Sequence, residues 1–147
     1  MTTAFDLATR YIWVKEIAGI ASNELILKML KLDHSWPEGD HVPWCSAFVN
    51  YIAWQLDLPR SKSLRARSWL KIGQPININI AKAEYDIVIM KRGKNQPGPE
   101  IIDAPGHVGF FEGFDDKFVY VLGGNQSDEV NISAYRRDSI LGIRRIK

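Results

Sequence analysis

The sequence contains a single cysteine, Cys45, so no disulfide can form within the chain. It also lacks any run of about 20 apolar residues, the length that a membrane-spanning helix needs, which predicts no stable membrane insertion. The segment from Met1 to Arg10 has neither the basic region nor the apolar region of a signal peptide. We therefore expect synthesis in the cytoplasm and interpret Cys45 as either a small buried hydrophobe or a reactive thiol.

The chain has no strong excess of charge of either sign. Its 19 basic and 17 acidic residues are interleaved and give a formal net charge of +2, which argues against a surface for nucleic acid. Hydrophobic residues make up 46% and charged residues 24% of the sequence, which excludes a disordered or fibrous chain. With 147 residues and no repeat or linker, residues 1–147 are expected to form one domain.

The first half of the chain has helical periodicity. Apolar residues recur at helical spacing from Thr3 to about Lys31, and Gly19 and Ser22-Asn23 divide this stretch into two helices. A third helix is expected from Trp44 or Cys45 to Gln55, and a shorter one around residues 63–71.

The second half has the pattern of strands separated by turns. The segment 91–105 contains Pro97, Pro99 and Pro105 and predicts an exposed loop. Helices followed by strands indicate an α+β fold with an antiparallel sheet. The five predicted strands are 86–90, 107–112, 118–122, 130–134 and 140–146.

Cys45 is predicted to lie in the first turn of its helix, because Pro43 stops helix formation upstream and the apolar pattern starts just after the cysteine. Free backbone N–H groups and the helix dipole at that end favour an anion. They can bring the pKa of a thiol from about 8.5 down to roughly 3.5–7.5. The same N–H groups can form an oxyanion hole. The competing interpretation is an inert cysteine packed with Trp44 and Phe48.

A thiol hydrolase also needs a base, and His107 is the best placed of the three histidines. It starts a strand directly after Pro105-Gly106, and Gly106 and Gly109 are expected to leave room for a helix end to approach. His34 and His41 lie in or beside an irregular loop before the cysteine and are weaker candidates.

A polar residue that orients the imidazole would complete the set. Asn125, in the turn Gly123-Gly124-Asn125-Gln126, follows the next predicted strand and is preferred over Gln126. Glu112 is about 16 Å from His107 at strand rise, which is out of reach.

Several blocks of the sequence, in matching order from Val14 to Arg145, resemble a group of bacterial and phage cell-wall hydrolases. This group is the CHAP and NlpC-type branch of the papain-like superfamily. The Trp-Cys-Ser-Ala-Phe and Gly-His-Val blocks are specific in combination. The resemblance is carried by Val14–Ile17, Pro43–Asn50, Ala66–Leu70, Tyr85–Val88, Gly106–Phe110 and Leu122–Gln126.

The resemblance implies a papain-like fold, no metal or other cofactor, and cleavage of a peptide or N-acyl amide bond of peptidoglycan. By position it makes Cys45 the nucleophile, His107 the base and Asn125 the polar partner. Asp86 matches an aspartate of such domains, although Tyr85 replaces the usual glycine before it. The residues expected to line or support the cleft, as core or as substrate contacts, are Trp44, Ser68, Trp69 and Gln126.

Two biological settings fit these expectations: a phage lysin released through a holin-type pore, and a secreted antibacterial effector neutralised by an immunity protein. Both place the action in the periplasm or cell wall. The alternative is a catalytically inactive papain-like domain that binds the wall or another partner. The sequence leaves open which amide bond is cut.

Overall fold

The computed structural model of the chain describes residues 2–17, 23–34 and 43–147. Within these residues the helices are α1 (Ala4–Thr9), α2 (Glu24–Leu30) and α3 (Cys45–Gln55), with 3-10 turns η1 (Ala66–Lys71), η2 (Ile78–Ile80) and η3 (Arg137–Ser139). Thr3 caps α1 through a capping box with Asp6, and Asn23 caps α2. No helix in this described part of the chain is long and apolar enough to cross a membrane.

The first predicted helix is much shorter than its periodicity indicates. α1 ends at Thr9, and the backbone N–H of Trp13 donates to Val130 O at 3.0 Å. Trp13 has a φ of 83°, in the left-handed region that a helix cannot use. A bridge between Lys15 and Glu129 continues this contact. Pairing with a distant strand therefore takes the backbone hydrogen bonds that would have extended the helix.

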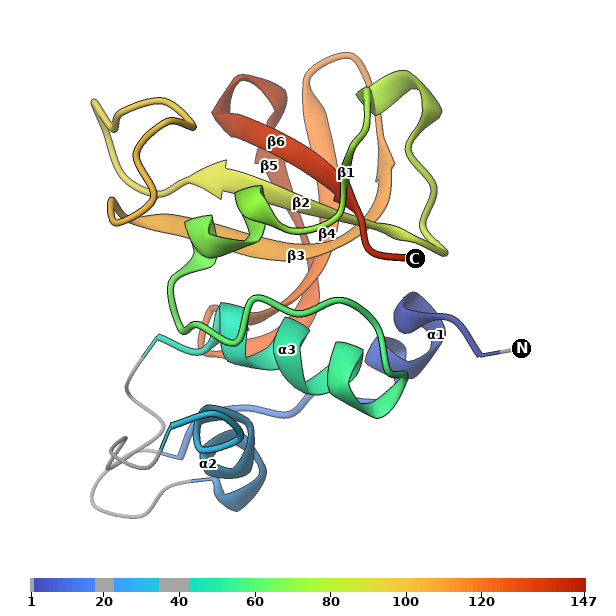
Figure 1. The fold of residues 1–147 in the computed structure, drawn as a ribbon, viewed down its shortest axis with the longest axis vertical. Coiled ribbons are helices and arrows are strands. Elements are labelled where there is room, and N and C mark those ends of the chain that lie inside the picture. Colours follow the sequence, from blue (N-terminus) through green and yellow to red (C-terminus); the bar gives the residue numbers. More distant parts are fainter. Residues whose placement is uncertain (1, 18–22, 35–42) are drawn as a thin grey trace.

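The strands form one antiparallel sheet in the order β1-β6-β2-β3-β4-β5, and the N-terminal helices lie on one side of it (Figure 1). The α+β fold class is therefore confirmed. All five predicted strands are present, and the two-residue β1 is an addition. The strand bounds are β1 (Gln74–Pro75), β2 (Asp86–Lys91), β3 (Gly106–Phe114), β4 (Phe118–Gln126), β5 (Glu129–Arg136) and β6 (Ile140–Arg145).

Apolar side chains on the two faces of the sheet belong to separate clusters. The larger cluster contains Phe48 and Ile52 of α3 together with Phe110 and Leu122 of the sheet. Because α3 is buried from Cys45 to Ala53, it is held against the sheet along most of its length. The smaller cluster, on the other face, contains Val88, Met90, Phe111, Val119, Val121 and Ile143. This packing fixes the N-terminal end of α3 relative to β3 and β4.

Candidate active site

Cys45 is the first residue of α3, as the sequence predicts. The preceding residue, Trp44, makes no side-chain cap, so the N–H groups of the first turn have no capping side chain among the described residues. Cys45 is 3% exposed. Cys45 therefore combines a helix N-terminus, which favours an anion, with burial, which opposes one.

His107 lies on β3, directly opposite Met90 of β2, and is 5% exposed. Burial raises the pKa of the Cys45 thiol, but the charge and hydrogen bond of His107 and the backbone N–H of Val108 outweigh it and lower the pKa overall. Burial likewise lowers the pKa of His107, but the Cys45 charge and hydrogen bonds with Cys45 and Gln126 raise it overall. The two groups therefore favour a thiolate beside an imidazolium.

Gln126 at the end of β4 is the residue that contacts the imidazole. Its Oε1 lies 2.9 Å from His107 Nε2. Its Nε2 donates to Val121 O at 3.2 Å, Asn131 O at 2.8 Å and Asn131 Oδ1 at 2.9 Å. Since all three are acceptors, the amide nitrogen must face them and the oxygen must face the imidazole. An amide oxygen only accepts, so His107 carries a proton on Nε2, which leaves Nδ1 for Cys45.

Asn125 does not make this contact, because β4 contains a bulge. Gly123 pairs with Asn131, and the next pair is Gln126 with Glu129, so β4 has one extra residue. The extra residue is accommodated at Asn125, whose φ of 58° lies in the left-handed region. Without the bulge, Asn125 would follow Gly123 on the His107 face. With it, Gln126 occupies that face.

Close approach of α3 to the sheet occurs at Gly124. A Cβ at Gly124 would lie 2.6 Å from the Trp44 ring and 3.0 Å from Phe48 Cβ. The glycines expected to admit the helix have other neighbours: a Cβ at Gly106 would meet the Arg67 side chain, and one at Gly109 would meet Val121. The space for the helix end is therefore on β4 and not on β3.

The side chains expected to contact substrate are largely unavailable for it in this conformation. Trp44 and Trp69 are 0% exposed and Gln126 is 3% exposed. Trp44 Nε1 donates to Glu16 Oε1 at 2.8 Å. Ser68 is partly exposed, and its hydroxyl donates to Arg65 O at 2.6 Å. Trp44 and Trp69 are thus core residues, and the amide of Gln126 is occupied by the imidazole and its acceptors.

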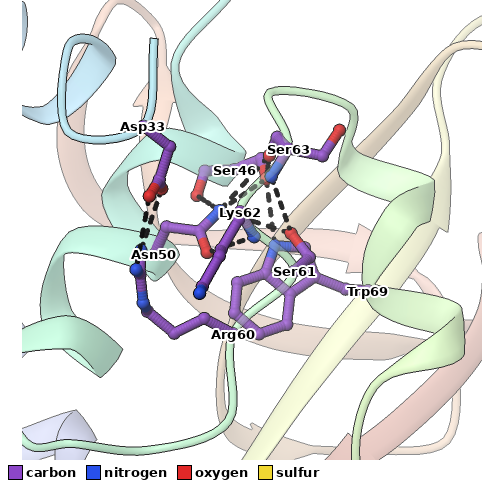
Figure 2. Close-up of polar contacts among 8 residues, drawn as sticks. All are labelled: Asp33, Ser46, Asn50, Arg60, Ser61, Lys62, Ser63 and Trp69. Atoms are coloured by element: carbon purple, nitrogen blue, oxygen red, sulfur yellow. Dashed lines mark hydrogen bonds and ion pairs between the residues drawn. The ribbon is translucent and has the colours of Figure 1, made fainter.

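Trp69 belongs to a polar network at the first turns of α3 (Figure 2). Its Nε1 donates to Ser46 Oγ at 2.9 Å, and the Ser46 hydroxyl donates to Ser63 O at 2.5 Å. Asn50, one turn further along α3, donates to Ser63 O at 3.2 Å and accepts from the Lys62 backbone N–H at 3.0 Å. The network ties the first two turns of α3 to the segment that follows the helix, so it restrains the residue next to Cys45.

Sequence reasoning missed Tyr135 and Arg92. The Tyr135 ring lies 5.2 Å from the His107 ring, centroid to centroid, with 33° between the planes. Burial and the Cys45 charge raise the pKa of Tyr135. Arg92 is exposed, and its charge lowers the pKa of both Cys45 and His107. Neither residue lies near Cys45 in sequence. Arg92 lies two residues after Met90, and Met90 pairs with His107. Strand alternation would therefore have placed Arg92 on the same face as His107 once that pairing was known.

Arg67 is a third residue whose role the sequence did not predict, because it holds the loop between β2 and β3. Its side chain is 0% exposed. Nε donates to Pro105 O at 2.9 Å, and Nη1 lies within 3.1 Å of three further carbonyl oxygens. These oxygens belong to Pro97, Gly98 and Ile101. Arg67 thereby joins the middle of the loop to its C-terminal end at Pro105, next to Gly106 and His107.

Comparison with known proteins supports the fold. No protein-family model matches the sequence, and no curated protein sequence matches it. Among solved structures, the chain is similar to NlpC1 from Trichomonas vaginalis, with a TM-score of 0.58 and 18% sequence identity. The match covers 97% of this chain and 42% of NlpC1, so the chain spans less than half the length of that protein. At this identity the likeness concerns the fold alone, and the fold is that of the NlpC-type papain-like proteins.

Proposed function

We propose that the protein is a cysteine hydrolase that cleaves an amide bond of bacterial cell-wall peptide. The observation that carries this proposal is the arrangement of Cys45, His107 and Gln126. A thiol at a helix N-terminus interacts with an imidazole whose other nitrogen is held by an amide oxygen. Nucleophile, base and orienting group are the three parts that thiol-dependent acyl transfer requires.

In the proposed mechanism the Cys45 thiolate attacks the carbonyl carbon of the scissile amide. The N–H groups of the first turn of α3, which have no capping side chain among the described residues, donate to the developing oxyanion, where one donor contributes about 3 kcal/mol. The His107 imidazolium gives its proton to the leaving amine, which departs and leaves a thioester on Cys45. Neutral His107 then takes a proton from water, which attacks the thioester and releases the acid.

Two further features support an active site over an inert buried cysteine. The pKa shifts of the thiol and the imidazole both favour the ion pair, although each group is almost fully buried. Gln126 places all its amide hydrogens on acceptors, so a single orientation of the imidazole is favoured. A cysteine that only fills core volume has no need of either feature. The choice of cell-wall peptide as substrate follows from the sequence blocks that resemble CHAP and NlpC-type hydrolases.

The test is digestion of purified peptidoglycan by the wild-type protein and by Cys45→Ala, with fragments identified by liquid chromatography and mass spectrometry. Fragments that appear with the wild type alone are expected, and their masses identify the bond. Circular dichroism confirms that the variant is folded. If folded wild-type protein releases no fragments from walls of several chemotypes, the proposal of a wall hydrolase is wrong and the inactive binding domain takes its place.

A further inference from the structure

Gln126 and Asn131 bind each other reciprocally across the β4–β5 hairpin. Gln126 Nε2 donates to Asn131 O at 2.8 Å and to Asn131 Oδ1 at 2.9 Å. In return, Asn131 Nδ2 donates to Gln126 O at 2.9 Å. We call these three hydrogen bonds the Gln126–Asn131 clamp. It joins the backbone and the side chain of the residue that contacts His107 to the neighbouring strand.

The clamp closes a hairpin whose turn is conformationally unfavourable. Ser127 and Asp128 form the two-residue turn with φ values of 53° and 62°. A turn with both central residues in the left-handed region favours Asn-Gly or similar pairs. A residue with a side chain costs up to about 1–2 kcal/mol there, more for Ser127 than for Asp128, because Asp and Asn adopt this region more readily. The bulge residue Asn125 adds a third left-handed residue. Contacts outside the turn must therefore stabilise the end of the hairpin.

Asn131 has partners that determine which way its amide faces. Nδ2 lies beside two acceptors, Gln126 O and Glu129 Oε1, at 2.9 and 3.1 Å. Oδ1 accepts from the Ser133 hydroxyl at 2.6 Å and from Gln126 Nε2. A reversed amide would set its oxygen against the oxygens of Gln126 and Glu129, and its NH2 group against the NH2 group of Gln126. The Asn131 oxygen is consequently directed at the Gln126 nitrogen, which directs the Gln126 oxygen at His107.

We propose that Asn131 is a positioning residue of this site. It holds Gln126 so that the Gln126 side-chain oxygen faces His107. Asn131 thereby influences Cys45 through Gln126 and His107. This inference rests on the proposed function. Two backbone carbonyls, Val121 O and Asn131 O, still receive the Gln126 amide hydrogens when the Asn131 side chain is removed. The expected effect of its removal is therefore a partial loss of orientation.

The test compares wild type, Asn131→Ala and Gln126→Leu with the double variant that combines both changes. Ile132→Ala is the matched control, because Ile132 lies next to Asn131 on β5, is 47% exposed and is not part of the clamp. Nitrogen-15 chemical shifts, recorded at a pH above the pKa of His107 where the ring is neutral, report which ring nitrogen carries the proton. The rate of alkylation by iodoacetamide against pH reports the Cys45 thiolate, since the chain has no other cysteine.

In Asn131→Ala we expect a smaller fraction of the neutral His107 ring with its proton on Nε2, and an alkylation midpoint at higher pH. We also expect kcat to fall on the order of tenfold with KM little changed, since two of the three hydrogen bonds of the clamp are lost. In the Gln126→Leu background, Asn131→Ala should cause no further shift of the midpoint. Ile132→Ala should behave as wild type.

Wild-type ring shifts and a wild-type alkylation midpoint in Asn131→Ala would overturn the proposal. So would a midpoint shift from Asn131→Ala that is as large in the Gln126→Leu protein as in the wild type. Should Asn131→Ala not fold, Asn131→Ser keeps a short polar group and is expected to shift the midpoint in the same direction, while an unchanged midpoint overturns the idea. The spectroscopic and alkylation measurements use no cell-wall substrate. They therefore separate failure of this proposal from failure of the proposed hydrolase activity.

Discussion

The side-chain oxygen of Gln126 lies 2.9 Å from Nε2 of His107, while the nitrogen of the same amide is held by three acceptors. This contact fixes the imidazole in the tautomer that offers Nδ1 to Cys45. It also helps to raise the pKa of a histidine whose burial alone would lower it.

Gln126→Leu should weaken the thiolate–imidazolium pair, because leucine cannot accept the Nε2 hydrogen. The pKa of His107 is then expected to fall, the midpoint of Cys45 alkylation to move to higher pH, and kcat to fall by about tenfold or more. Asn125→Gly is the matched variant, since it removes the neighbouring side chain and keeps a backbone suited to a φ of 58°. If kcat falls further in Asn125→Gly than in Gln126→Leu, Asn125 and not Gln126 orients the imidazole.

Arg92→Gln should move the alkylation midpoint of Cys45 to higher pH, because the Arg92 charge lowers the pKa of the thiol. The pKa of His107 should rise as well, since the same charge disfavours the imidazolium. Arg92 is exposed, so the difference between variant and wild type should shrink as salt is added. Lys91→Gln, at the adjacent exposed cation, controls for net charge. An equal midpoint shift in Lys91→Gln would show a general charge effect.

Gly124→Ala should lower the free energy of unfolding by about 1–3 kcal/mol, because the new methyl group would overlap the Trp44 ring. Urea denaturation measures the change. Gly113→Ala is the control, since a Cβ there meets nothing within 4 Å, and its stability should stay within about 0.5 kcal/mol of wild type. Equal stability of the two variants would mean that α3 does not pack on Gly124 as described.

Arg67→Lys should loosen the loop between β2 and β3, because an ammonium group cannot reach four carbonyl oxygens that a guanidinium spans. With at least two charge-assisted hydrogen bonds lost, we expect a drop in stability of roughly 3 kcal/mol and faster trypsin cleavage after the exposed Lys94. Arg65→Lys is the matched control, because Arg65 is exposed and donates to one carbonyl, Asp103 O. Unchanged cleavage in Arg67→Lys would contradict this anchoring role.

Local signals in the sequence determined the elements that bear the thiol and the imidazole. Pro43 and the apolar periodicity after it predict a helix that starts at Cys45, and α3 begins there. Pro105-Gly106 predicts the start of a strand at His107, and β3 begins one residue earlier. These signals work because helix and strand boundaries depend on a few consecutive residues.

Only the tertiary structure decided which residues complete the site. The position of Asn125 in the turn after the predicted strand favoured it as the partner of His107, but one extra residue in β4 places Gln126 there instead. Whether a strand contains a bulge depends on its pairing with a neighbour, here the register of β4 against β5. The carbonyl oxygens around Arg67 and the stacking of Tyr135 on His107 likewise join segments that are distant in sequence. No periodicity within one segment carries that information, because it exists only once the strands are paired and the loop has closed.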